Sequence, residues 1–198
     1  MRTLTNQRAL DLLKLYGVPV LNYTLVSNPQ EITNNQRPFV LKIDSPSIIH
    51  KSERKGVVPV HDNKQLAKHF RKLRKHGQVI KQPLVKGHSF VIQVIKPTRG
   101  KLSLILGFGG VSTDIHNDFA LRICPIKPSS AQKMIEELQT FNYFSEFEGK
   151  QTRFDVLADV LSKISILAKK EKLHSLEIDP FILNHKAGRV VDAKIVLD

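Results

Sequence analysis

The chain has no tryptophan and a single cysteine, Cys124, among its 198 residues. One cysteine excludes an internal disulfide framework and a zinc site built from several cysteines. No apolar run approaches the roughly 20 residues that a membrane-spanning helix needs. The residues after Met1 contain no apolar segment of the secretory-signal type. We therefore expect a cytoplasmic protein without a membrane partner.

Acidic residues are scarce beside basic ones: 18 Asp and Glu stand against 31 Lys and Arg, a formal net charge of +13. Such a surplus suits a nucleic-acid binder, a binder of phosphorylated small molecules, or a well-solvated surface. The densest basic stretch, residues 64–75, has Leu66, Phe70 and Leu73 at helical spacing. It predicts an amphipathic helix with a basic outer face, which favours a solvated surface over a nucleic-acid groove.

The pattern of apolar residues predicts an α+β protein. Helices are predicted at residues 5–16, 64–75, 129–138 and 154–170, and strands at 20–26, 39–43, 57–60, 78–85, 89–96, 101–106, 119–124, 176–183 and 189–197. Most strands follow one another directly instead of alternating with helices. That order indicates mostly antiparallel sheets in two lobes and excludes the regular alternation of a doubly wound fold.

Three places in the first half of the chain are candidates for phosphate chemistry. Lys42 lies in a strand among apolar neighbours, where lysine is rare unless paired or functional; the pattern alone slightly favours a lysine on an exposed strand face. His50, beside Lys51, is either a phosphate contact or nucleophile or an ordinary surface histidine. Residues 107–110 (GFGG) either offer backbone N–H groups to a phosphate or form a tight turn.

The terminal hairpin contains a group of carboxylates. Glu177 and Asp179 alternate onto the same face of one predicted strand, and pairing with the second arm can bring Asp192 opposite them. Clustered carboxylates repel one another unless a cation neutralises them, and Mg²⁺ takes oxygen ligands of this kind. The sequence therefore predicts a magnesium site here, with a structural salt bridge to Arg189 or Lys194 as the alternative.

In order and spacing, six segments resemble the ATP-grasp domain of the ADP-forming acetyl-CoA and acyl-CoA synthetases and, more distantly, the succinyl-CoA synthetase β subunit. The segments are residues 15–20 (LYGVPV), 40–53 (VLKIDSPSIIHKSE), 106–111 (LGFGGV), 119–126 (FALRICPI), 176–181 (LEIDPF) and 191–195 (VDAKI). The second is the most specific, because it is similar to the family pattern VLKIxSPDIxHKSD. The segments are distributed along the chain, so the resemblance extends over almost its whole length.

The resemblance implies an ATP-grasp fold, with two lobes of mostly antiparallel sheet and the nucleotide between them. The approximate lobes are residues 18–85 and 86–198, with residues 1–17 packed on the larger one. It implies the nucleotide-binding β subunit of an ADP-forming acid-thiol ligase, which exchanges phosphate between ATP or ADP and a phosphohistidine with Mg²⁺. A separate α subunit would hold the CoA chemistry.

The resemblance also implies roles for individual residues. The catalytic residues would be His50, which would carry a phosphoryl group transiently, and Arg122; the nucleotide-binding residues would be Lys42, Lys51, Gln82, Gly109 and Gly110; and Asp179, Asp192 and Glu177 would hold the metal.

Several positions depart from the family pattern, among them Lys55-Gly56, which stands where the family has a glycine-rich pair. Pro83 replaces an acidic hinge residue, Ser89 replaces a glutamate and Gln93 replaces a glycine. These changes keep a second function open, that of a degenerate ATP-grasp paralogue that binds nucleotide or a partner and regulates it. A third possible function is that of a basic RNA-binding module, which predicts that nucleic-acid affinity falls steeply with salt and that Mg·ATP has no effect. Nucleic acid is nevertheless not an expected partner.

Overall fold

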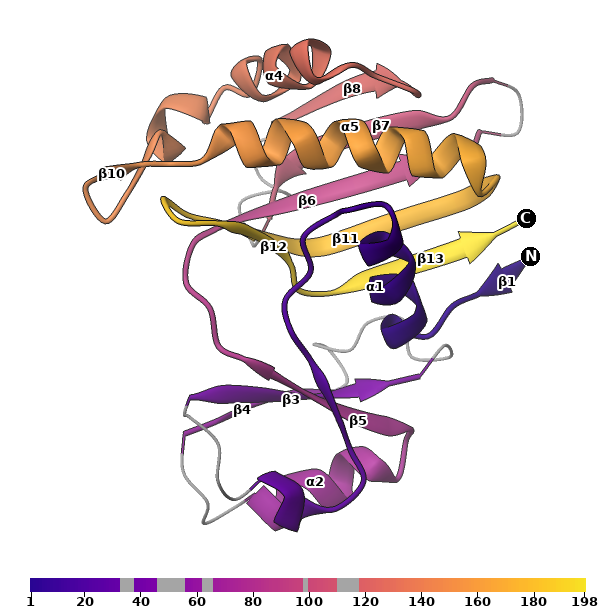
Figure 1. The fold of residues 1–198 in the computed structure, drawn as a ribbon, viewed down its shortest axis with the longest axis vertical. Helices are drawn as coiled ribbons and strands as arrows, with labels where there is room; N and C mark the ends of the chain where they lie inside the picture. Colours follow the sequence, from indigo (N-terminus) through magenta and orange to yellow (C-terminus); the bar gives the residue numbers. More distant parts are fainter. Residues whose placement is uncertain (33–37, 46–55, 62–65, 98–99, 110–117) are drawn as a thin grey trace. The chain divides into compact units, whose positions relative to one another are not determined.

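The computed structural model describes residues 1–32, 38–45, 56–61, 66–97, 100–109 and 118–198. The chain forms two compact units (Figure 1), which we call unit 1 (Met1–Val20 with Lys86–Asp198) and unit 2 (Leu21–Val85). No helix among the described residues has both the length and the apolar character needed to cross a membrane.

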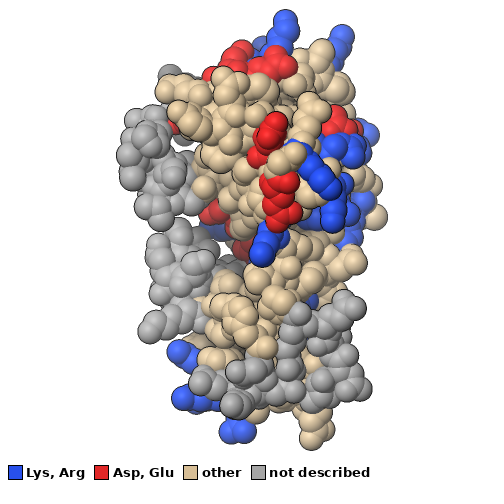
Figure 2. Space-filling view, turned by 90° about the vertical axis from the view of Figure 1, so that its left-hand side faces the viewer, with Lys and Arg blue, Asp and Glu red and all other residues tan. Residues whose placement is uncertain are grey.

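Unit 2 is a four-stranded antiparallel sheet with one helix packed on it. Its strands are β2 (Thr24–Val26), β3 (Phe39–Asp44), β4 (Val57–Val60) and β5 (Gln78–Pro83), in the order β2-β5-β3-β4, and they are joined by the short helix η1 (Pro29–Ile32) and by α2 (Leu66–Arg74). The buried residues of α2 are Leu66, Phe70 and Leu73, at the spacing that places them on one helix face. At the end of unit 2 that carries α2, the charged atoms in view in Figure 2 are those of Lys and Arg. The predicted amphipathic helix is confirmed.

The two faces of β3 differ in chemistry. Phe39, Leu41 and Ile43 join the apolar core with α2. Because side chains alternate along a strand, Lys42 and Asp44 lie on the other face, and both are buried. The expectation that Lys42 occupies an exposed face is therefore wrong.

Unit 1 contains a seven-stranded antiparallel sheet. Its strands are β1 (Arg2–Thr3), β6 (His88–Ile95), β7 (Ser103–Phe108), β8 (Phe119–Ile123), β11 (Leu173–Leu183), β12 (Gly188–Val190) and β13 (Ala193–Leu197), in the order β1-β13-β11-β6-β7-β8 with β12 paired to β11. The first and last strands pair, with Arg2 opposite Leu197, so the two ends of the chain lie side by side (Figure 1).

Among its described residues, unit 1 also contains three α-helices, one short helix and a small hairpin. They are α1 (Asn6–Leu15), α4 (Pro128–Glu136), α5 (Phe154–Lys170), the short helix η2 (Phe141–Phe144) and the strands β9 (Glu146–Phe147) and β10 (Lys150–Gln151). Thr5 caps α1 by accepting a hydrogen bond from the N–H of Arg8. The end of α1 is tied to α5, because Lys163 donates to the carbonyl of Gly17 at 3.1 Å.

The unit 1 sheet has one face covered by helices, which we call the helix face. Cross-strand partners share a face, and the register places on the helix face the buried residues Phe90, Ile92, Val94, Leu104, Leu106, Ala120, Leu176, Ile178, Ala193 and Ile195. Helix α5 contacts β11 and β6, and α4 contacts β8. The opposite face, called the far face, carries the intervening residues, and most of these are partly or fully exposed.

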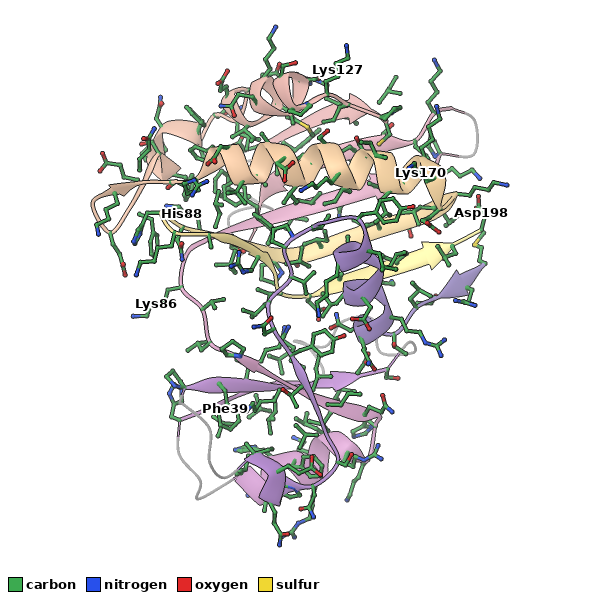
Figure 3. The ribbon with its side chains drawn as sticks, in the orientation of Figure 1. Phe39, Lys86, His88, Lys127, Lys170 and Asp198 are labelled. Carbon is green, nitrogen blue, oxygen red and sulfur yellow. The ribbon has the colours of Figure 1, made fainter. Side chains whose placement is uncertain are left out.

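Aromatic side chains close one end of the helix face. Phe108 stacks on Phe144 with ring centroids 3.6 Å apart, and His88 meets Phe144 edge-on at 5.0 Å. The ring of His88 also contacts the carbonyl oxygen of Glu146 at 2.8 Å. Figure 3 shows His88 and Asp198 at opposite ends of the sheet.

The α+β class and the antiparallel sheets agree with the prediction, and the differences are local. The strand predicted at 20–26 is shorter, because β2 covers only Thr24–Val26. The second arm of the terminal hairpin is divided into β12 and β13 at Val191 and Asp192. The strands β1, β9 and β10 contain two residues each, which is too short to show a period of two.

Candidate functional site

The carboxylates of the terminal hairpin lie at a β-bulge in β11. Ile178 pairs with Ile92 of β6, but the next pair is Phe181 with Phe90. Two residues of β11, Asp179 and Pro180, therefore stand opposite one residue of β6. A bulge of this kind bends its strand and redirects side chains. Glu177 precedes the bulge, Asp179 is its first residue, and by alternation the two side chains share the far face.

Asp192 lies across the hairpin from Asp179. The ladder pairs Glu177 with Lys194 and Ile178 with Ala193, and one further step in the same register pairs Asp179 with Asp192. The N–H of Val191 donates to the carbonyl of Pro180 at 3.1 Å, which fixes this register beside the two aspartates. The predicted placement of Asp192 opposite Asp179 is confirmed.

Helix α1 contributes a polar contact to this group. The side-chain nitrogen of Asn6 donates to Asp192 Oδ1 at 2.6 Å and to the carbonyl of Ala193 at 3.1 Å. Asn6 is buried, with 3% of its surface exposed. Asn6 therefore fixes the carboxylate of Asp192 and the start of β13 together.

The electrostatics of the group favour a bound cation. Partial burial of the carboxyl group, the neighbouring Glu177 and then Asp192 raise the pKa of Asp179, although the residue as a whole is exposed. Lys194 lies opposite Glu177, and Arg189 bonds to the carbonyl of Gly188. Within the described part of the chain, neither forms an ion pair with Asp179 or Glu177, which argues against a structural salt bridge at these two carboxylates.

The donor set fits Mg²⁺ in an open site. No three Asp, Glu, His or Cys side chains of the described residues converge closely enough to enclose a metal by themselves. Mg²⁺ is commonly held by one or two carboxylates together with waters and substrate phosphates. The hard oxygen ligands of Asp179 and Asp192 suit that arrangement, with Glu177 beside them.

Lys42 and Gln82 lie together in unit 2. Val40 pairs with Gln82 and Lys42 with Ile80, so both polar side chains share the face of the sheet opposite the α2 core. Their exposed fractions are 5% and 0%. A buried lysine has given up water, which makes it a strong point charge for an anion. Asp44 shares this buried face, and the sequence analysis did not single it out.

The structure changes the interpretation of Gly109. Its N–H donates to the carbonyl of Ser89 at 2.9 Å, which extends the β6–β7 ladder, so this N–H is not directed at a phosphate. A Cβ at Gly109 would lie 2.3 Å from Ser89 Oγ. The glycine is thus explained by close contact with β6, although its Cα can still line a site.

Arg122 lies apart from the carboxylates. It pairs with Leu104, which places it on the helix face, and its guanidinium bonds to Glu137 at 2.5 Å. Glu177 belongs to the far face, three strands away. The structure therefore does not bring Arg122 together with the carboxylates, and its catalytic role stays a prediction. His50, Lys51 and Gly110 lie outside the described residues.

Asn6 and Asp118 are further polar residues that the sequence analysis missed. Asp118 is buried and accepts hydrogen bonds from the N–H groups of Gln139 and Thr140, at 2.8 and 2.9 Å. These bonds hold the segment that follows α4. Thr5 marks the start of α1, but no local signal shows that the next residue reaches a strand at the other end of the chain.

Residues 1–197 match the family model of the ATP-grasp domain. The chain therefore belongs to the ATP-grasp domain family, and the predicted fold is confirmed. Among proteins of known activity, it is 27% identical to the Pyrococcus furiosus acetate–CoA ligase [ADP-forming] I subunit beta, covering 99% of this chain and 92% of that one. The subunit beta of isoenzyme II is also 27% identical, covering 96% and 89%. The predicted relationship to these ligases is confirmed.

Other relatives carry the matching region inside a longer chain. An Archaeoglobus fulgidus acetate–CoA ligase [ADP-forming] is 25% identical over 95% of this chain, which spans 30% of that protein. Among solved structures, one from Pyrococcus horikoshii superposes with a TM-score of 0.89 at 25% identity, covering 99% of this chain and 92% of that one. A Korarchaeum cryptofilum acetyl-CoA synthetase, in complex with coenzyme A and Mg-AMPPCP, gives 0.85 at 25% identity, covering 99% and 93%.

Proposed function

We propose that this chain is the nucleotide-binding β subunit of an ADP-forming acyl-CoA ligase. The observation that carries the proposal is the carboxylate group of Glu177, Asp179 and Asp192, placed at a bulge of an ATP-grasp chain with a raised pKa at Asp179. Such a group is stabilised by a cation that brings phosphates with it.

Each unit would contribute a different part of the chemistry. In unit 2, Lys42 would neutralise nucleotide phosphate oxygens from its buried position, and Gln82 would hydrogen-bond to the nucleotide. In unit 1, Asp179 and Asp192 would hold Mg²⁺, and Asn6 would keep Asp192 oriented. When bound, Mg²⁺ would neutralise charge on the β- and γ-phosphates.

In the synthesis direction, His50 would exchange a phosphoryl group with the nucleotide. A ring nitrogen of His50 attacks the γ-phosphorus, the bond to the β–γ bridging oxygen breaks, and ADP leaves with that electron pair. The ring then loses its N–H proton to solvent. Positioning and cationic groups dominate the catalysis of such transfers, which agrees with the lysines and carboxylates proposed here. Lys51, Gly110 and Arg122 stay predictions as supporting residues.

The relatives support a partner for the remaining chemistry. Two are named subunit beta, and the Korarchaeum structure contains coenzyme A and a phosphohistidine segment that points towards its nucleotide site. Nothing in this chain resembles a CoA-binding Rossmann lobe. We propose that a separate α subunit binds CoA and the acyl group. The cytoplasmic localisation stays a prediction.

Thermal stability with and without Mg·ATP tests nucleotide binding. A ligand at a hundred times its Kd stabilises the folded state by about 2.7 kcal/mol, a rise of several degrees in Tm for a chain of this size. We expect Asp179→Asn and Asp192→Asn to abolish the rise. Glu146→Gln, on the β9–β10 hairpin, is the matched control and should keep it. A wild-type Tm that does not change when Mg·ATP is added contradicts the proposal.

Phosphoryl transfer needs its own measurement. Labelled ATP with Mg²⁺ should give an acid-labile, base-stable label that His50→Ala removes. Pro83 and Ser89 favour the second candidate function, a paralogue that binds nucleotide without turnover. That function predicts a normal Mg·ATP shift and no label, even after the α subunit is added.

A further inference from the structure

One corner of the far face is apolar and exposed. Phe119, Leu121 and Ile123 alternate along β8 and expose 59%, 44% and 54% of their surfaces, and Ile95 of β6 exposes 42%. Alternation places all three β8 residues on one face. The β8 partners of the buried Leu104 and Leu106 are Arg122 and Ala120. The exposed residues therefore point away from α4 and α5.

The register shows how far this apolar surface extends. Its rows across β6, β7 and β8 are Val91–Gly107–Phe119, Gln93–Ile105–Leu121 and Ile95–Ser103–Ile123. None of these nine positions is charged, in a chain with 25% charged residues. We call the apolar members Val91, Ile95, Ile105, Phe119, Leu121 and Ile123 the β8 patch.

The β8 patch adjoins the carboxylates of the candidate site. The central row continues through Gln93 to Glu177 and Lys194. Neighbouring strands lie about 4.8 Å apart, so Leu121 is roughly 14 Å from Glu177 across the sheet. A molecule bound over the patch would therefore extend to the part of the far face next to Glu177 and Asp179.

The edge of β8 is protected, although its face is not. The N–H of Cys124 donates to Leu102 of the neighbouring segment, so the carbonyl of Leu121 points outwards by alternation. Arg122 donates to that carbonyl at 2.8 Å and bonds to Glu137. A charged side chain on an edge strand opposes pairing with another strand. A partner is therefore expected to cover the face of β8 without extending the sheet.

The exposed area suits the centre of a protein interface. The exposed fractions of Phe119, Leu121, Ile123 and Ile95 correspond to roughly 400 Å² of apolar surface, given about 200 Å² for each side chain. Patches of this size on single chains are often functional. An interface buries about 800 Å² on each partner, with an apolar centre and a polar rim.

Charge and the relatives select the occupant. Two copies of a chain with net charge +13 repel each other, and the exposed Lys101 and Lys127 flank the patch strands in sequence. A partner with an acidic rim is therefore favoured over a second copy. The name subunit beta, which two relatives carry, implies a second kind of subunit in those enzymes. In Archaeoglobus fulgidus the matching region is 30% of a longer chain.

We infer that the β8 patch is the docking surface for the CoA-binding subunit. This inference rests on the proposed function and extends it, because the patch would place that subunit beside Glu177 and Asp179. Its rim should be acidic, opposite the flanking lysines.

Co-expression with the CoA-binding subunit of the same organism tests the inference. Leu121→Asp and Ile123→Asp each introduce a charge into the centre of the patch and should weaken the complex about 100-fold. Ile166→Asp is the matched control, because Ile166 on α5 is 40% exposed but lies away from β8; its Kd should stay within about twofold of wild type. Titration calorimetry measures Kd, and Tm without ligand checks that each variant folds.

The Mg·ATP shift in Tm separates the two proposals. Leu121→Asp should keep the full shift while losing the partner, whereas failure of the proposed function removes the shift from wild type. Wild-type affinity in both patch variants overturns the inference. So does a wild-type chain that responds to Mg·ATP but forms no complex. If the chain alone forms a dimer and Leu121→Asp dissociates it, the patch binds a second copy of the chain and not the CoA-binding subunit.

Discussion

Asn6 Nδ2 lies 2.6 Å from Asp192 Oδ1, although 186 residues separate them in the chain. The same nitrogen donates to the carbonyl of Ala193, so one amide fixes both a carboxylate and the backbone beside it. Groups that orient metal ligands are a general requirement of metal sites. The first helix is thereby connected to the last strands at the candidate site.

Asn6→Ala should weaken Mg²⁺-dependent nucleotide binding without removing any ligand. Loss of a contact that orients a ligand typically costs 10- to 100-fold in metal affinity. We expect a drop of about that size in the apparent Mg²⁺ affinity, measured by titrating Mg²⁺ at fixed ATP and following Tm. Arg8→Ala, on the exposed side of α1, is the control. Unchanged Mg²⁺ affinity in Asn6→Ala would show that the amide only joins α1 to β13.

Asp179→Asn should stabilise the protein in the absence of ligands at neutral pH. The pKa of Asp179 is higher in the folded chain than its ordinary value of 3.8, so the folded state binds the proton more tightly. The free energy of unfolding therefore falls as the pH rises from about 3.8 through the raised pKa. In thermal melts from pH 3.5 to 7.5, the Tm of the variant should rise relative to that of wild type over this window. At higher pH the difference in Tm should stay constant. A variant that is less stable at pH 7 would be evidence for a structural ion pair.

The sequence could predict the elements of this site because they depend on local patterns. The period of two in the terminal hairpin predicted Glu177 and Asp179 on one face with Asp192 opposite. The bulge at Asp179 could not be predicted, because it appears only in the pairing of β11 with β6. The Asn6 contact also depends on two distant segments that meet only in the folded chain.

The burial of Lys42 illustrates a second limit of sequence analysis. The sequence shows an apolar strand with one lysine, a pattern that slightly favours an exposed position for the lysine. Burial on both faces of β3 is a property of the folded unit, and a local pattern does not contain it.

Gly109→Ala should destabilise unit 1 through a clash with β6. The added Cβ would lie 2.3 Å from Ser89 Oγ and 3.2 Å from its Cβ, and overpacking of this kind costs about 1–3 kcal/mol. Ser89→Ala in the same chain should restore part of the loss, because it removes the shortest contact. Gly149→Ala is the comparison: its φ of +70° is strained but no atom lies within 4 Å, so Ser89→Ala should not rescue it. Urea unfolding measures the three single variants and the two double variants with Ser89→Ala, and additive effects at 109 and 89 would exclude the clash.

Cys124 should react slowly with thiol reagents. Burial raises the pKa of its thiol to about 11 from an ordinary 9.0, and the thiolate is the reactive form. At pH 8 the native protein should be alkylated by iodoacetamide about 100-fold more slowly than the chain unfolded in guanidinium. The native rate should still be rising at pH 10. A native rate equal to the unfolded one would place the thiol in contact with water.

Lys42→Met should separate phosphate binding from folding. Methionine fills most of the volume of the lysine stem, and volume-conserving changes are the ones that packed positions tolerate best. We therefore expect a Tm without ligand within a few degrees of wild type, and a loss of most of the Mg·ATP shift. Lys81→Met is the matched control on the neighbouring strand: Lys81 lies on the other face of the sheet, with Nζ 5.5 Å from the Phe39 ring centroid, and its loss should leave the shift intact. If Lys42→Met instead lowers the Tm without ligand sharply and keeps the Mg·ATP response, the buried cation serves the fold of unit 2 and not the nucleotide.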